Sequence, residues 1–140
     1  AALLDLAARW AAPDEGVDLV VCGAHLRGQP LNDQLLALGA RFGRATATAP
    51  FYRMYALPGG RPGLVRADGG AAIEVEVWRL GAAALGRLAA STRAPLAIGT
   101  VELADGTSTR GFVCEAYAAA AAEDITAFGG WRAWLAAAPV

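Results

Sequence analysis

One loop of the sequence gathers residue types from which a small-anion site can be built. The segment GAHLRGQPLN (residues 23–32) follows an apolar run and contains two glycines and the only histidine of the chain. Backbone N–H groups in a turn between a strand and a helix can converge on one anion, and His25 adds a side chain that titrates near neutral pH. The alternative interpretation is a structural histidine bonded to the backbone, with Gly28 only shaping a turn.

Two carboxylates on a predicted strand are candidate partners of that histidine. Side chains alternate along residues 72–80, which places Glu74, Glu76 and Trp78 on one face. If this face lines a cleft, Glu76 can orient His25 or carry a proton, and Trp78 favours burial of the face. The alternative is a solvent-facing side of the strand, which is the commoner location of glutamate.

Arginine and tyrosine side chains on another predicted strand are candidates for holding a carboxylate ligand. In FYRMYAL, Arg53 and Tyr55 share one strand face, and the planar guanidinium group matches the geometry of a carboxylate. Arg66, which follows PGLV, is a second candidate. For each arginine the alternative is a surface residue whose aliphatic stem packs on apolar neighbours.

Composition narrows the classes of function. The 140 residues suffice for one domain, and 12 basic against 13 acidic residues argue against a nucleic-acid-binding surface or a basic membrane-binding patch. All basic residues are arginines, which excludes a lysine Schiff base, a P-loop lysine and a Ser–Lys pair. Cys22 and Cys114 with a single histidine cannot assemble a Cys/His metal site, so we expect two reduced, buried thiols and a cytoplasmic protein. No apolar run reaches the roughly 18 residues that a membrane span needs.

The hydrophobic pattern predicts an α+β domain. Asp105-Gly106 is the strongest hairpin signal and should turn residues 97–104 onto 107–116. Asn32 is the predicted N-cap of a short helix, and Gly129-Gly130 weakens a last helix that opens at Asp124. Mostly sequential strands favour a mixed, mainly antiparallel sheet that can curl into a barrel. The remaining expected elements are a helix over 1–12, strands over 17–22, 40–48, 51–57 and 72–80, a turn-rich loop over 58–63 followed by the strand-like LVR (64–66), and a helix over 82–90.

Motifs along nearly the whole chain resemble the C-terminal domain of allophanate hydrolase. The resemblance covers residues 17–135, and GAHLxGxPLN and DITxFGGW are specific motifs within it. It implies a γ-glutamylcyclotransferase-like fold, in which a small mixed, mainly antiparallel β-barrel has flanking helices. We therefore assign residues 17–140 to this domain, after an N-terminal helix and linker over residues 1–16. The matching segments are VCGAHLRGQPLN (21–32), FYRMYALPGGRPGLVR (51–66), AAIEVEVWRL (71–80), PLAIGTVELADG (95–106), GFVCEAY (111–117) and DITAFGGWRAWL (124–135).

The resemblance also implies an activity. In that family an N-terminal amidase domain removes ammonia from allophanate with a Ser–Ser–Lys triad, and this chain has no lysine to complete such a triad. The C-terminal domain is implied to take the amidase product, N-carboxycarbamate, and to promote its decarboxylation. Protonated His25, in the GAHL motif, would act as general acid, and neither a cofactor nor a metal is required. The predicted site adds Glu76 as a catalytic residue and, as substrate-binding residues, Gly23, Ala24, Leu26, Tyr55, Arg53 and Arg66.

A cyclotransferase activity is not expected, and other functions stay open. The catalytic glutamate of the cyclotransferases has no counterpart in LAASTRAPL (88–96), which holds no carboxylate. The expected partners are a small dicarboxylate substrate, the amidase domain of a full-length protein and a second copy of the chain, but neither nucleic acid nor a membrane. The alternatives are a non-catalytic module that drives oligomerisation or stabilises the amidase, and a stand-alone protein that binds a small anion.

Overall fold

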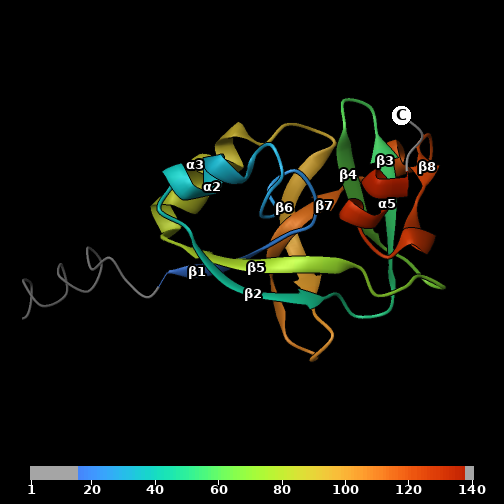
Figure 1. Cartoon of the computed structure of the whole chain (residues 1–140), viewed down its shortest axis with the longest axis horizontal. Helices are drawn as coiled ribbons and strands as arrows, with labels where there is room; N and C mark the ends of the chain where they lie inside the picture. The colour runs from blue at the N-terminus through green and yellow to red at the C-terminus, as the bar shows by residue number, and fades with distance from the viewer. Residues whose placement is uncertain (1–15, 138–140) are drawn as a thin grey trace, which may run out of the picture.

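Two β-sheets form the framework of the protein (Figure 1). The computed structural model describes residues 16–137, so the predicted helix over 1–12 lies outside the described residues. The strands are β1 (Val17–Val21), β2 (Arg41–Ala47), β3 (Tyr52–Leu57), β4 (Arg61–Arg66), β5 (Glu74–Leu80), β6 (Leu96–Glu102), β7 (Ser108–Cys114) and β8 (Glu123–Asp124). Within this part of the chain, the larger sheet has five strands in the order β2-β5-β1-β7-β6, and the smaller has three in the order β4-β3-β8.

The larger sheet is organised around β1 and β5. β5 pairs antiparallel with β1 on one side and with β2 on the other, so that Glu76 faces Val21 and Ala45 across the two pairs. β1 runs parallel to β7. Leu19, Val20 and Val21 of β1 are all buried, so both faces of this central strand are covered. This burial makes the end of β1 a rigid base for the loop that follows it.

The hairpin of β6 and β7 confirms the strongest local prediction. The two strands pair antiparallel from Leu96 opposite Cys114 to Glu102 opposite Ser108. Gly106 has a φ of 86°, which a residue with a side chain rarely adopts. Asp105 stabilises the turn by accepting a hydrogen bond of 2.9 Å from the N–H of Thr107.

The smaller sheet corrects two expectations. Residues 58–63 are not all loop, because β4 begins at Arg61 and pairs with β3 from there. The sheets also do not close into a barrel: an isolated bridge between Thr48 and Leu103 joins the ends of β2 and β6, while β4-β3-β8 stays a separate sheet. The mixed, mainly antiparallel α+β class itself is confirmed.

Short helices cover the two ends of the framework. Figure 1 shows α2 (Asn32–Ala37) and α3 (Ala82–Ser91) together at one end, and α5 (Trp131–Ala137) beside the smaller sheet at the other. The chain reaches α5 through α4 (Ala116–Ala119), β8 and the 3-10 helix η1 (Thr126–Phe128). None of the helices in the described part of the chain is both long and apolar enough to cross a membrane.

Two helix predictions were wrong in detail. Leu31 occupies the N-cap position of α2, and Asn32 makes no side-chain cap, because its amide donates to the carbonyl of His25 instead. The last helix does not open at Asp124. Gly129, with a φ of 76°, ends η1 and separates it from α5.

Candidate functional site

The loop over residues 23–32 is a compact turn pressed against the smaller sheet. The Leu26 N–H donates to the Gly23 carbonyl at 3.0 Å, and the Leu31 N–H donates to the Ala24 carbonyl at 2.8 Å. Gly23 is required by packing, because a Cβ at this position would lie 2.1 Å from Cγ of Pro62. The loop therefore lies directly against the start of β4.

The side chain of His25 is held on two sides. Its ring stacks on that of Phe112, with centroids 5.0 Å apart and planes at 7°, and its Nε2 lies 2.6 Å from Oε1 of Gln34 on α2. Burial lowers the pKa of His25, and the Gln34 hydrogen bond raises it by less, so the pKa falls below its ordinary value. The neutral imidazole therefore predominates at neutral pH, and Nδ1 has no hydrogen bond to any residue from 16 to 137.

A cavity opens beside this imidazole. A narrow hollow of about 60 Å³ adjoins a wider one of about 210 Å³. Ala24 lines the first, and its N–H and that of His25 find no acceptor among the described residues. Arg93 and Gln34 line only the second. Both hollows are lined by His25, Leu31, Arg61, Leu96 and Phe112.

Two arginines thus share a cavity with the histidine, although neither was selected from the sequence. Arg61 stands at the start of β4 and Arg93 follows α3. A larger, open hollow of about 450 Å³ elsewhere on the surface is lined by no histidine or cysteine. The smaller cavity at His25 is therefore the better candidate for a reaction that needs a proton donor or acceptor near neutral pH.

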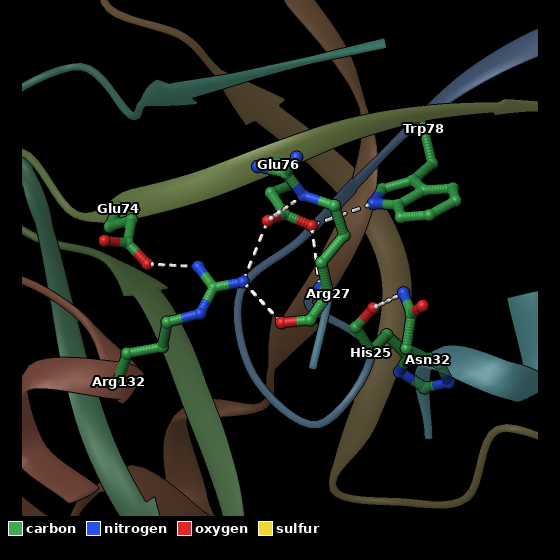
Figure 2. A network of polar contacts seen from close by, with 7 residues as sticks. All are labelled: His25, Arg27, Asn32, Glu74, Glu76, Trp78 and Arg132. Atoms are coloured by element: carbon green, nitrogen blue, oxygen red, sulfur yellow. Dashed lines mark hydrogen bonds and ion pairs between the residues drawn. The ribbon is translucent and has the colours of Figure 1, made fainter. Parts of the chain in front are cut away.

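Glu76 lies on the other side of the loop, in a network of charged groups (Figure 2). Its side chain is fully buried, and each carboxylate oxygen accepts two hydrogen bonds. Oε1 accepts from the Arg27 N–H and from Nε1 of Trp78, both at 3.0 Å. Oε2 accepts from Nε of Arg27 at 3.1 Å and from Nη2 of Arg132 at 2.9 Å.

Those donors decide the protonation state of Glu76. Burial on its own raises the pKa of the carboxyl, but the hydrogen bonds from Arg132, Arg27 and Trp78 together hold it below its ordinary value. Glu76 is therefore an anion with both oxygens occupied. Figure 2 shows the imidazole of His25 pointing away from this carboxylate, so Glu76 acts on the loop and not on the ring.

The other predicted binding residues lie in different contacts. Arg53 donates to Asp124 at 2.9 Å and to the Gly69 carbonyl at 3.1 Å, and Arg66 stacks over the ring of Phe51 at 4.3 Å. Tyr55 lies half-buried in β3. None of the three lines the cavity at His25, and their part in binding stays a prediction.

Two further predictions concern sulfur and metals. Cys22 and Cys114 are free and buried, and burial raises the pKa of Cys22 to about 12, so this thiol is unreactive at neutral pH. Among the residues from 16 to 137, no group of three or more His, Cys, Asp or Glu side chains is placed to hold a metal ion.

Comparison with known sequences decides the family. A sequence model described as "Allophanate hydrolase C-terminal domain" matches residues 17–136. The chain belongs to this family. Among the relatives of the domain, the urea amidolyases of Saccharomyces cerevisiae and Lachancea kluyveri are 38% and 35% identical to it, over 88% and 89% of this chain. The chain spans 7% of the length of each of these relatives.

Solved structures agree with this assignment. The urea amidolyase of K. lactis superposes on the domain with a TM-score of 0.82 and 36% identity, covering 87% of this chain and 8% of that one. A protein described as specific to uropathogenic E. coli superposes with a TM-score of 0.83 and 32% sequence identity, covering 90% of this chain and 100% of that one. A γ-glutamyl cyclotransferase with a TM-score of 0.54 and 14% identity, covering 79% of this chain and 70% of that one, shares the fold alone.

Proposed function

We propose that this allophanate hydrolase C-terminal domain binds N-carboxycarbamate and promotes its decarboxylation to carbamate. The observation that carries the proposal is the cavity in which His25, the only imidazole of the chain, lies with Arg61 and Arg93. The proposal also rests on the family, whose name places the domain in an enzyme that acts on allophanate.

The cavity offers separate groups for the two carboxylates of this substrate. Arg61 and Arg93 supply guanidinium groups, which bind carboxylates in a planar fork. The N–H groups of Ala24 and His25 are further donors without a partner among the described residues. The apolar side chains of Leu96 and Phe112 strengthen these polar contacts by excluding water from the same cavity. A small dianion therefore fits the charge and the size of the site.

The reaction needs one proton at the substrate nitrogen. The C–N bond to one carboxylate breaks, CO₂ leaves, and the electron pair of the bond remains on nitrogen. His25 donates the proton that turns this nitrogen into the amino group of carbamate, and water then returns a proton to the imidazole. Nδ1 is the ring nitrogen that serves the substrate, because Gln34 already engages Nε2.

The lowered pKa of His25 suits this role. It makes the imidazolium a stronger acid than an ordinary histidine, and an arriving dianion favours the protonated form at the moment of binding. Binding of the substrate thus supplies the proton donor that the free protein mostly lacks at neutral pH.

Replacing His25 by asparagine tests the proposal. CO₂ release is followed while an allophanate-cleaving amidase generates N-carboxycarbamate, with this domain, with His25→Asn, or with no domain added. We expect His25→Asn to fold normally and to lose about 10²-fold in the rate above spontaneous decay. Parent protein that gives no acceleration over spontaneous decay, or a variant as fast as the parent, would contradict the proposal.

A non-catalytic role is the second candidate, and the surface beside the loop favours it. Leu31, at the N-cap of α2, is 45% exposed, and Leu36, within α2, is 53% exposed. Both side chains are available for a partner to cover. The relatives are also far longer than this chain. In this case the domain would raise the thermal stability of the amidase or change its oligomeric state without accelerating CO₂ release.

A further inference from the structure

Side chains from outside the loop over residues 23–32 hydrogen-bond to its backbone at one residue, Arg27. Both backbone groups of Arg27 are held: its N–H donates to Oε1 of Glu76 at 3.0 Å, and its carbonyl accepts from Nη2 of Arg132 at 2.7 Å. Arg27 stands two positions after His25. Displacement of its peptide groups would therefore be passed on to the imidazole through a few bonds.

Glu76 and Arg132 also hold each other. Nη2 of Arg132 lies 2.9 Å from Oε2 of Glu76, while Nη1 lies 2.7 Å from Oε1 of Glu74. The guanidinium group thus joins β5 to the loop with a single side chain from α5 (Figure 2). A buried carboxylate needs all its partners, because an uncompensated charge in the interior is strongly unfavourable. The contacts are consequently interdependent.

Two glycines bring Arg132 to this position. Gly129 turns the chain with a φ of 76°, and its carbonyl accepts from the Glu74 N–H at 2.8 Å. At Gly130 a Cβ would lie 2.9 Å from Cβ of Glu74, so only glycine lets the start of α5 approach β5 this closely. The turn and the guanidinium group act together on one end of β5.

We infer that Glu76 and Arg132 are positioning residues for His25, which hold the loop over residues 23–32 in the shape that lines the cavity. This inference rests on the proposed function, since it assigns the pair to the same site. Neither residue lines the cavity, so they act through Arg27 and not on the substrate. The C-terminal segment of the domain is thereby part of the site.

The test uses Arg132→Lys and Glu76→Gln with a matched control. Lysine keeps the charge but has one nitrogen in place of the fork that reaches Glu74, Glu76 and the Arg27 carbonyl. Glutamine keeps the shape but presents an amide N–H₂ to donors. Arg79→Lys is the control, because Arg79, like Arg132, bonds a carboxylate of the larger sheet, in this case that of Asp18 at 3.0 Å.

Three quantities are measured for each variant. The first is the chemical shift and pKa of the imidazole by NMR, which is unambiguous because the chain has one histidine. The second is the affinity for malonate, a stable dicarboxylate, and the third is kcat for CO₂ release. We expect Arg132→Lys and Glu76→Gln to weaken the upfield shift that stacking on Phe112 causes, to raise the pKa of His25 toward 6.5, to weaken malonate binding and to lower kcat about 10-fold or more. Arg79→Lys should match the parent.

The outcomes separate this inference from the proposed function. Imidazole signals and malonate affinity equal to the parent in both variants would overturn the inference even if parent catalysis is observed. Parent protein without catalysis would overturn the proposed function, while the NMR and malonate measurements still decide the positioning role. If Glu76→Gln does not fold, Arg132→Lys decides. Unfolding of Arg132→Lys with a folded control would overturn the inference, since it would assign the pair to global stability.

Discussion

The imidazole of His25 lies flat against the ring of Phe112, with 5.0 Å between the ring centroids and 7° between the ring planes. This contact removes water from one face of the imidazole and contributes to the burial that lowers its pKa. The two residues come from different elements: His25 lies in the loop that follows β1, and Phe112 lies within β7, which runs parallel to β1. The parallel pairing of these strands is thus what gives the histidine its apolar neighbour.

Binding of a dicarboxylate should take up a proton at His25. The free imidazole is mostly neutral at neutral pH because its pKa is lowered, and a bound dianion raises that pKa by favouring the charged form. Malonate should therefore bind with proton uptake and more tightly as the pH falls through the range between the two pKa values. Calorimetry in two buffers with different ionisation enthalpies measures the uptake directly. His25→Asn is the control, because it retains only the titration of malonate itself, and equal proton uptake by this variant and the parent would exclude His25 as the titrating group.

The same lowered pKa predicts a pH dependence of stability. The unfolded chain binds a proton at the ordinary histidine pKa of about 6.5, whereas folded His25 binds it only at lower pH. The free energy of unfolding should therefore be highest above this value and should fall as the pH drops from about 6.5 to the folded pKa. Chemical denaturation of the parent and His25→Asn over this range gives the difference between them. A difference that is constant with pH would show that folded His25 titrates like the unfolded residue.

The two sets of arginines can be separated by their effect on malonate affinity. Arg61→Gln and Arg93→Gln should each weaken binding about 10-fold, because each removes a guanidinium group that lines the cavity and that would donate to a bound carboxylate. Arg53→Gln and Arg66→Gln should change affinity by less than about 2-fold, since salt weakens interactions of distant exposed charges. Calorimetric titration of the four variants at one salt concentration makes the comparison. A larger loss at Arg53 or Arg66 would restore the sequence-based prediction.

Most of the fold could be predicted from local sequence patterns. The period of two in β5 and the Asp105-Gly106 turn depend on neighbours in sequence, and both were predicted with nearly the observed bounds. Burial of Glu76 was one of two possibilities left open by its place beside Trp78, and the structure shows that burial with a hydrogen bond of 3.0 Å between the two side chains. Glu74, which was predicted on the same face, is exposed. The alternation could not show that the sheets stay open, because closure depends on which distant strands pair.

The site was harder to predict because its charged groups come from distant segments. Arg61 lies in a stretch whose prolines and glycines indicated a turn, and Arg93 follows a helix without any motif of its own. Arg132 stands in FGGWR, where paired glycines were interpreted as a weakness of the helix, although in the structure they allow its close approach to Glu74. For Arg53 and Tyr55 the pattern predicted a shared strand face, and for Arg66 only a place after PGLV. It did not predict that Arg53 pairs with Asp124 or that Arg66 stacks on Phe51.

Replacing Gly130 by alanine should disturb His25 although no charged residue is replaced. The added Cβ would lie 2.9 Å from Cβ of Glu74, which is close to the backbone of β5 and cannot swing aside. Such overpacking costs about 1–3 kcal/mol, more than the roughly 0.4–1 kcal/mol gained from a less flexible unfolded chain. The start of α5 must move, and Arg132 moves with it. We expect a lower free energy of unfolding in denaturant titrations, together with an NMR shift of the His25 ring in the same direction as for Arg132→Lys.

Gly86→Ala is the control, because Gly86 lies inside α3 with no atom near its added Cβ and alanine favours a helix there by about 1 kcal/mol. If Gly130→Ala loses stability while the His25 signal stays at its parent position, the turn before α5 supports the fold alone, and the link from this turn to the loop is refuted.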